Sequence, residues 1–361
     1  MGTLNTKRNC LMDIMKGLGV IAIVVGHANQ GEVSHFVYLY HMPLFFFISG
    51  YFYNDAYSQS VEGIITLIKK RIKSLYWPYL KYSLVFLCLH NLFFKIHIYG
   101  EDVLYGDKII HPYTIEEFIK TLLKVLLFAS REPMGAIFWF FTVLFFINIG
   151  FSIIGFISYH LSSNQRTREY LRFSLVLASF MFGNVLTYLG VTIPRFNNTL
   201  VMVIVFYTGF MFKKYEDKVD TKNKYIAGFC LVGLLFNMLY GSVAVNTNHY
   251  LSPDFLLVNM ALGVYVNYYC SYVIANHETA RKAISYIGKN SIIIIALHFL
   301  CFKIVDLLQI YLFDLSIDKL ASFPMINSGG CWWIVYTFVG LIIPIMIQFI
   351  KDNINNKLVK R

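Results

Sequence analysis

The stretch SIIIIALHFLCF at residues 291–302 decides the fold class. It is an almost unbroken apolar run, and a second run, VLFFINIGFSIIGFI, occupies residues 143–157. Such runs are typical of membrane-spanning helices, because a helix of about 20 residues crosses the ~30 Å hydrocarbon core. A transmembrane barrel would instead show segments of about ten residues with alternating polarity. The two runs therefore predict an all-α membrane protein.

The composition of the whole chain agrees with these runs. Of its 361 residues, 57% are hydrophobic and 14% are charged, whereas a soluble chain has about 45–50% apolar and about 25% charged residues. A chain with so little charge cannot cover itself for water, which excludes a soluble enzyme, a disordered protein and a small disulfide scaffold. The six cysteines show no CxxC or zinc-binding spacing, and no metal is expected.

We predict a polytopic helical bundle of about ten membrane-spanning helices. No repeat and no Gly/Ser-rich linker divides the chain, which indicates a single domain over residues 1–361. The predicted spans, with boundaries good to a few residues, are 11–29, 36–54, 76–98, 136–158, 171–190, 198–213, 225–243, 254–275, 290–312 and 331–350.

Positive charge is distributed unequally between the connections. Of the 31 Lys and Arg residues, 21 lie at the chain ends or in one alternate set of connections, and six lie in the other set. Because cytoplasmic connections carry the excess of Lys and Arg, both termini are predicted to be cytoplasmic. Topology thus explains the net charge of +11, and no nucleic-acid partner is expected.

One outer connection, residues 99–135, is long. Its segment IEEFIKTLLKVLLFAS (115–130) has apolar residues at helical spacing and charged residues on another side. This pattern predicts an amphipathic helix lying in the outer membrane interface. A structural brace is the simpler interpretation of this helix, and a cover over an active site is the other.

The first span, LMDIMKGLGVIAIVVGHANQ (11–30), holds the most informative pair of residues. Lys16 and His27 are eleven residues apart, which places them within ~20° of one helix face and ~16 Å apart along the axis. Ionisable groups inside a span are costly and usually face a cavity or a partner. A cavity along this face would suit a long thin molecule with an anionic end. The alternative is an interfacial Lys with a helix-packing His.

Further polar groups mark the other spans. His41 and Ser49 belong to YHMPLFFFISGYFY (40–53), and Arg71 and Lys73 belong to KKRIKSLYWPYL (69–80). Arg geometry suits a phosphate clamp, although orientation charges explain the same cluster. Trp139 is predicted near the outer boundary. His298 lies mid-membrane and needs a buried polar partner, while Lys303 and Asp306 are spaced to pair with each other on one helix.

These motifs, in this order, resemble the membrane acyltransferase 3 family, with a character closest to its fucose 4-O-acetylase-like branch. The segments that carry the resemblance are LMDIMKGLGVIAIVVGH (11–27), YHMPLFFFISGY (40–51), KKRIKSLYWPY (69–79), FWFFTVLFF (138–146) and IGKNSIIIIALH (287–298). The resemblance covers nearly the whole chain in layout, and its most specific motifs lie in residues 12–80.

The resemblance implies an O-acetyltransferase of the bacterial cytoplasmic (inner) membrane that takes part in surface polysaccharide biosynthesis. It implies acetyl-CoA as donor and a glycan or lipid-linked sugar as acceptor. The family's basic-residue–x10–His motif falls on Lys16 and His27, with Lys where Arg is commoner, and its basic pair before the third span falls on Arg71 and Lys73. His27 is then the catalytic residue and His41 a second candidate, while Lys16, Arg71 and Lys73 bind the donor.

Four residues are weaker candidates for orienting the donor or the acceptor: Asp13, Ser49, Trp139 and His298. We hypothesise that the CoA phosphates lie at the cytoplasmic end and that the thioester reaches His27, which accepts a proton from a sugar hydroxyl. A transporter or flippase of glycan intermediates is the alternative function. The chain lacks the inverted repeats and the broken spans typical of many transporters.

Overall fold

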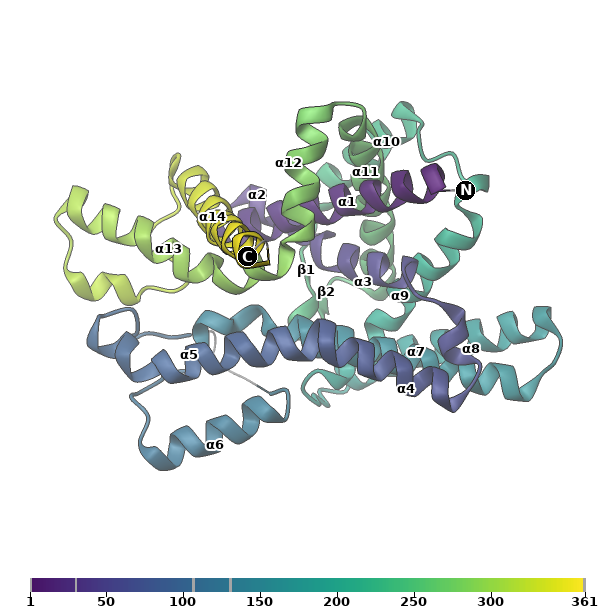
Figure 1. The fold of residues 1–361 in the computed structure, drawn as a ribbon, viewed down its shortest axis with the longest axis horizontal. Helices are drawn as coiled ribbons and strands as arrows, with labels where there is room; N and C mark the ends of the chain where they lie inside the picture. The colour runs from purple at the N-terminus through teal and green to yellow at the C-terminus, as the bar shows by residue number, and fades with distance from the viewer. Residues whose placement is uncertain (1, 30, 106–107, 130–131, 360–361) are drawn as a thin grey trace. The chain divides into compact units, whose positions relative to one another are not determined.

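The computed structural model describes residues 2–29, 31–105, 108–129 and 132–359 (Figure 1). These residues are almost entirely helical. Their strands are two short segments, β1 (Val243–Ala244) and β2 (His249–Tyr250), paired antiparallel. The chain forms two compact units. Unit 1 comprises Met1–Val37, Leu80–Phe138 and His277–Arg361, and unit 2 comprises Tyr38–Tyr79 and Trp139–Asn276.

Seven of the described helices are long and apolar enough to cross a membrane, which confirms an all-α polytopic membrane protein. Each falls on a predicted span. The seven segments are Cys10–Ala28, Pro133–Leu161, Gln165–Tyr188, Phe196–Lys218, Pro253–Ala275, Ser291–Phe313 and Trp332–Asn355.

The three other predicted spans fall on helices of a different kind. Helix α3 (His41–Tyr51) has 11 residues and α10 (Lys224–Asn237) has 14. At 1.5 Å per residue they measure about 17 and 21 Å, short of the ~30 Å core. Helix α5 (Trp77–Lys95) is longer but includes Lys81, His90 and Asn91. The count of ten and the cytoplasmic termini stay predictions, and the chain ends, residues 1 and 360–361, lie outside the described residues.

Unit 1 is built around the first and the last long helices. Helix α1 packs on α12 and also contacts α13 and α14, and α13 packs along α14. Close approach of α1 and α12 requires glycine on both helices. A Cβ at Gly288 would lie 1.8 Å from the Asp13 carbonyl oxygen, and one at Gly17 would lie 2.2 Å from that of Ile284. The elements are α1 (Gly2–Ala28), α2 (Glu32–Tyr38), α5, α6 (Ile115–Leu126), η3 (Pro133–Phe138), α12 (Glu278–Lys289), α13 (Ser291–Phe313), η6 (Ile317–Ala321) and α14 (Trp332–Val359).

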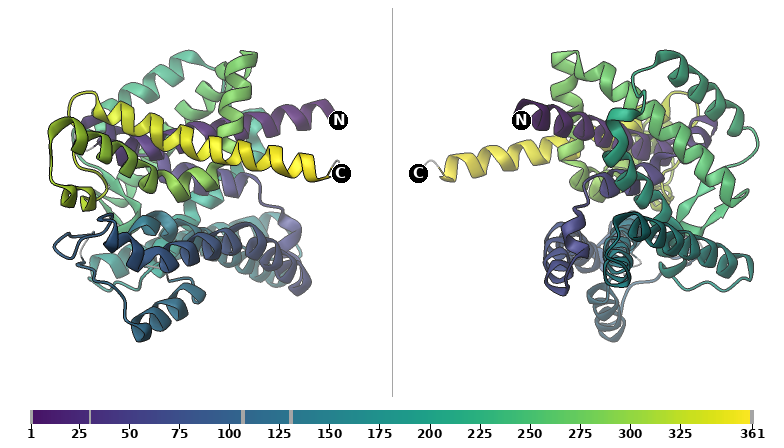
Figure 2. Two further views of the ribbon diagram at one scale, coloured as in Figure 1. Left: turned by 60° about the vertical axis from the view of Figure 1, so that its left-hand side comes forward. Right: turned by 90° about the vertical axis from the view of Figure 1, so that its right-hand side faces the viewer.

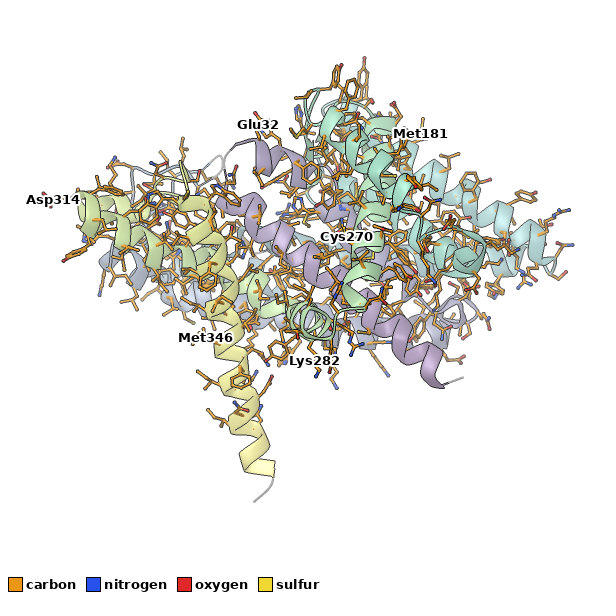
Figure 3. The ribbon with its side chains drawn as sticks, turned by 90° about the horizontal axis from the view of Figure 1, so that it is seen from above. Glu32, Met181, Cys270, Lys282, Asp314 and Met346 are labelled. Carbon is orange, nitrogen blue, oxygen red and sulfur yellow. The ribbon has the colours of Figure 1, made fainter. Side chains whose placement is uncertain are left out.

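Helix α14 extends beyond its packing partners in unit 1. Figure 2 shows its C-terminal part projecting away from them, and Figure 3 places Met346 on this part. Met346 is 56% exposed, and other apolar residues of the helix, such as Phe349 and Ile350, are also exposed. An apolar surface of this kind suits contact with lipid.

Unit 2 is a bundle of membrane-spanning and shorter helices. Helix α9 contacts α3, α7 and α8, and α10 pairs with α11. Helices α3 and α9 approach closely because each has a glycine at the crossing. Cβ atoms at Gly50 and Gly209 would each lie 1.9 Å from a carbonyl oxygen of the facing helix. The remaining elements are η1 (Asp55–Ser58), α4 (Val61–Arg71), η2 (Ile72–Tyr76), α7 (Trp139–Leu161), α8 (Gln165–Tyr188), α9 (Phe196–Tyr215), η4 (Glu216–Lys218), η5 (Val245–Thr247) and α11 (Pro253–Ala275).

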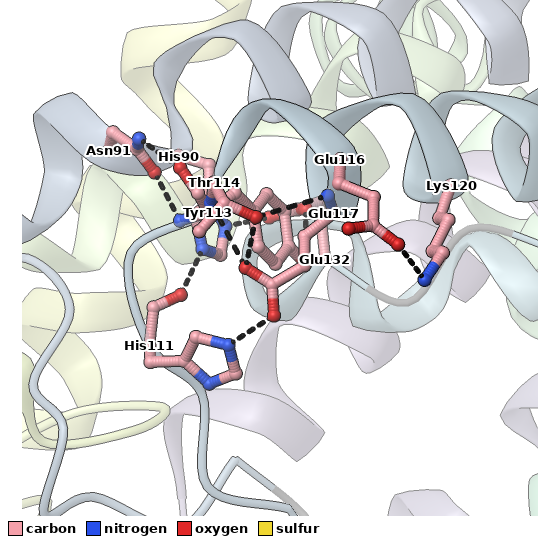
Figure 4. A network of polar contacts seen from close by, with 9 residues as sticks. All are labelled: His90, Asn91, His111, Tyr113, Thr114, Glu116, Glu117, Lys120 and Glu132. Atoms are coloured by element: carbon pink, nitrogen blue, oxygen red, sulfur yellow. Dashed lines mark hydrogen bonds and ion pairs between the residues drawn. The ribbon is translucent and has the colours of Figure 1, made fainter.

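The predicted outer connection contains helix α6, and its Tyr113 and Glu132 form a buried hydrogen-bond network with His90 of α5 (Figure 4). His90 Nδ1 lies 2.9 Å from Glu132 Oε2, and both residues are buried. His90 Nε2 donates to the His111 carbonyl oxygen at 3.0 Å. Tyr113 stacks on His90 with ring centres 3.6 Å apart and donates to Glu132. Burial and the Glu132 carboxylate raise the pKa of Tyr113.

Helix α6 begins with a reciprocal cap. The Thr114 hydroxyl accepts from the Glu117 backbone N–H, and the Glu117 carboxylate accepts from the Thr114 backbone N–H (Figure 4). Glu117 also bonds His111 at 2.7 Å. The His111 and Thr114 hydrogen bonds lower the pKa of Glu117 to about 2. The amphipathic helix thus exists as predicted, and its place in the membrane interface stays a prediction.

Candidate active site

The strongest candidate site in the structure is a pair of histidines in unit 1. His27 lies in the last turn of α1 and His298 in the second turn of α13. His27 Nδ1 and His298 Nε2 are 2.9 Å apart, and the two ring planes differ by 11°. His298 is fully buried and His27 is half-buried. The buried polar partner predicted for His298 is therefore His27, 271 residues away in the chain.

Backbone carbonyls assign the protons of this pair. His298 Nδ1 lies 3.1 Å from the Ile294 carbonyl oxygen and 2.9 Å from that of Ile295. A carbonyl oxygen only accepts, so His298 Nδ1 carries a proton. In the neutral ring His298 Nε2 is then the acceptor, and His27 Nδ1 must donate to it. A neutral His27 in this tautomer carries its lone pair on Nε2, the nitrogen suited to accept a proton.

Aromatic rings surround the pair. The Phe299 ring centre lies 4.9 Å from that of His27 and 4.2 Å from that of His298, and Phe302 packs edge-on against His298. These contacts hold the two imidazoles in an apolar setting. Phe302 follows His298 by four residues, a helical spacing that brings their side chains together.

A second polar cluster lies two turns further along α13. Lys303 donates to Asp306 Oδ2 at 2.8 Å, which confirms the predicted pair. Asp306 Oδ1 accepts from the Tyr336 hydroxyl at 2.5 Å and from the Ile326 backbone N–H at 3.0 Å. With this many partners Asp306 is satisfied as a buried structural anchor between α13 and α14.

Lys16 lies on α1 three turns before His27. Its Nζ is 3.4 Å from Asp13 Oδ1, and the two side chains are 29% and 18% exposed. Val20 and Ile23, which lie between Lys16 and His27 on the predicted face, are buried. The structure therefore gives Asp13, predicted as an orienting residue, a contact with Lys16. Donor binding by Lys16 stays a prediction.

The other predicted donor-binding residues belong to unit 2. Arg71 ends α4, and Lys73 lies in the π-helical turn η2, a kind of helix irregularity that is frequent at functional sites. The Nε of Arg71 is buried with no hydrogen-bond partner among the described residues. Burial lowers the pKa of the Arg71 guanidinium, and Tyr57 and Tyr53 act in the opposite direction.

Three more predicted residues lie in unit 2. His41 begins α3, is buried, and packs edge-on against Tyr38 with ring centres 4.8 Å apart. Ser49 accepts from Asn148 Nδ2 at 3.4 Å, and Trp139 begins α7. A site that joins His41, Arg71 or Lys73 to His27 stays a prediction, since His27 belongs to unit 1.

Sequence reasoning missed several of the contacts described above. The spacing of Phe302 from His298 offered a signal for the aromatic rings around the pair, whereas the separation of 42 positions between His90 and Glu132 offered none. Within the described ranges no three His, Cys, Asp or Glu side chains are grouped so as to hold a metal ion.

The long apolar helices define the class of the protein as a multi-pass helical membrane protein. Two of these helices, α1 and α13, carry the hydrogen-bonded imidazole pair. A family model described as an acyltransferase domain matches residues 11–349. The chain belongs to the acyltransferase 3 family, and it is a multi-pass membrane acyltransferase. No curated protein and no solved structure matches the chain.

Proposed function

We propose that the protein is an O-acyltransferase that moves an acetyl or other short acyl group from cytoplasmic acyl-CoA to a hydroxyl of a cell-surface polysaccharide or its lipid-linked precursor. The bacterial cytoplasmic membrane is its proposed location. The observation that carries this proposal is the His27–His298 hydrogen bond, which orients an imidazole within an apolar site.

In a direct transfer, His27 Nε2 accepts the proton of the sugar hydroxyl as a general base. The hydroxyl oxygen attacks the thioester carbonyl carbon and forms the ester C–O bond. The C–S bond breaks, and the CoA sulfur leaves as a thiolate that takes the proton from His27. His298 is a positioning residue in this scheme, because it holds the ring through Nδ1 and does not touch the reacting atoms. His41 is the second candidate for the base.

Lys16, Arg71 and Lys73 are proposed to bind the CoA phosphates. Arg71 is the best supported of the three, because its buried Nε has no partner among the described residues and can donate to a phosphate oxygen. Asp13, Ser49 and Trp139 keep their proposed orienting roles.

The test is the O-acetyl content of the surface glycan, measured by NMR in cells that carry wild-type protein or His27→Ala at equal membrane levels. We expect the ester signal to disappear while the polymer still reaches the surface. An unchanged ester signal would refute the role of His27, and loss of the polymer itself would favour a transporter.

A further inference from the structure

Unit 2 contains a cavity of about 820 Å³ that the mechanism above does not use. This volume falls in the range of small-molecule sites, about 300–1,000 Å³. The cavity lies among η1, α7, α8 and α9. Its lining has two more cationic than acidic side chains: Arg168, Arg172, Lys213 and Lys214 against Asp55 and Glu169.

Arg172 is the central cation of this lining. It is 5% exposed, and one of its Nη atoms lies 2.7 Å from Asp55 Oδ1. Its Nε is buried and has no hydrogen-bond partner among the described residues. A guanidinium has five N–H donors, and a buried cation is costly unless it is well paired. The Asp55 contact uses one Nη of Arg172, which lines the cavity while its Nε stays unpaired among the described residues.

Arg168 lies one turn before Arg172 on α8, and it too has a buried Nε without a hydrogen-bond partner among the described residues. One Nη of Arg168 donates to the Ser163 carbonyl oxygen at 3.3 Å. Lys214, in contrast, forms an ion pair with Glu169. With Arg172 paired to Asp55 and Lys214 to Glu169, Arg168 and Lys213 supply the positive charge that the lining itself does not neutralise.

Aromatic rings lie beside both arginines. The Arg168 guanidinium carbon is 4.4 Å from the Tyr159 ring centre, and that of Arg172 is 5.1 Å from the Phe210 ring centre. Tyr159, Tyr207 and Phe210 all line the cavity. Arginine forks match phosphate oxygens, and aromatic faces stack on planar bases. The lining thus offers both elements that a nucleotide requires.

The cavity also approaches the predicted phosphate cluster. Tyr53 lines it and is close enough to both Arg172 and Arg71 for electrostatic interaction. Residues 69–73, 166–172 and 213–214 all belong to connections that the charge distribution assigns to the cytoplasmic side. Arg71 and Arg172, which come from two of these predicted connections, thus both lie near Tyr53 in unit 2.

We propose that this cavity binds clustered phosphate groups beside a planar ring, and that its ligand is the nucleotide end of the acyl-CoA donor. The inference rests on the proposed function and adds Arg168 and Arg172 to the donor-binding residues. A phosphorylated lipid headgroup shares the phosphate chemistry but lacks the base that the rings would stack.

The test titrates the full-length protein in neutral detergent with coenzyme A, 3′-dephospho-coenzyme A and inorganic pyrophosphate, and separately with vesicles containing a phosphoinositide. The variants are Arg168→Ala and Arg172→Lys, the second of which keeps the charge opposite Asp55. Arg166→Ala is the matched control, because Arg166 is exposed on the same helix and does not line the cavity.

We expect Arg168→Ala to weaken coenzyme A binding by about ten- to a hundredfold, the loss of one charge-assisted hydrogen bond. Arg172→Lys should weaken it less, and Arg166→Ala should leave it unchanged. The KM for acyl-CoA should rise with kcat retained. Equal coenzyme A binding by the wild type and both cavity variants would overturn the inference, as would Arg168-dependent binding of phosphoinositide vesicles without coenzyme A binding.

Turnover separates this inference from the proposed function. If His27→Ala abolishes transfer while Arg168→Ala and Arg172→Lys bind coenzyme A normally, only the cavity assignment fails. If coenzyme A binds in an Arg168-dependent manner but the wild type transfers no acyl group, only the proposed reaction fails.

Discussion

Replacing His298 with leucine removes the acceptor for the Nδ1–H of His27 and leaves an apolar side chain of similar size beside Phe299 and Phe302. We expect the His27 ring to lose its fixed tautomer and orientation while the helix packing is kept. In His298→Gln the side-chain amide oxygen can still accept from Nδ1. The proposed mechanism therefore ranks the rates as wild type, then His298→Gln, then His298→Leu, with His27→Ala the slowest.

The magnitude follows from the hydrogen bond that is lost. A buried donor left without an acceptor costs about 1–3 kcal/mol, and 1.4 kcal/mol corresponds to tenfold. If this whole free energy normally holds His27 Nε2 toward the hydroxyl, its loss raises the activation barrier by the same amount. The kcat of His298→Leu then falls about 5- to 140-fold. Removing the base itself in His27→Ala costs about 10²–10⁴-fold. A double variant should be no slower than His27→Ala, because His298 acts only through His27.

The assay is the initial rate of transfer from radiolabelled acetyl-CoA to surface glycan in membranes with equal amounts of each variant. Its control is coenzyme A binding, which all four proteins should retain because the pair holds no phosphate. A His298→Leu protein with the wild-type rate would refute the positioning role. So would a His298→Gln protein slower than His298→Leu, since a tautomer-fixing acceptor should help and not hinder.

Three further predictions concern stability. Gly288→Ala should lower the melting temperature in detergent, because its Cβ would lie 1.8 Å from the Asp13 carbonyl oxygen; Gly150→Ala, with no atom within 4 Å of its Cβ, should not. Glu132→Ala leaves the buried His90 without its hydrogen-bond partner, which should cost about 1–3 kcal/mol and speed proteolysis of residues 99–135; Glu116→Ala, at an exposed pair, should change little. The ionised Glu117 carboxylate should stabilise α6 above its ordinary pKa of 4.5, and this stabilisation should be lost as the pH falls toward about 2. The loss should be seen as faster hydrogen exchange in α6, and Glu117→Gln should flatten this pH dependence.

Part of this structure could be predicted from the sequence because its causes are local. The apolar runs place all seven long spans, and the helical spacing of Lys303 and Asp306 predicts their contact. A polar partner for His298 could be expected, since a buried imidazole needs a hydrogen bond. That this partner is His27 could not, because α1 and α13 come into contact only in the folded protein. The same applies to Arg172. The sequence indicates only that it is one of the cytoplasmic positive charges, whereas its burial opposite Asp55 depends on the packing of α8.

The contrast between the two buried histidine contacts of unit 1 bears on the mechanism. His90 of α5 pairs with the Glu132 carboxyl group, which lies in the predicted outer connection, and this contact holds the connection to α5. His27 is paired with an imidazole inside the spans. His298 orients the His27 ring as a carboxylate would, but it brings no negative charge into an apolar site, where an ionised group is costly. In the proposed mechanism, the proton that His27 accepts is therefore not stabilised by His298 as it would be by an aspartate, and its passage to the departing thiolate is favoured. On this argument, His298→Asp is not a conservative change, and it should slow transfer more than His298→Gln.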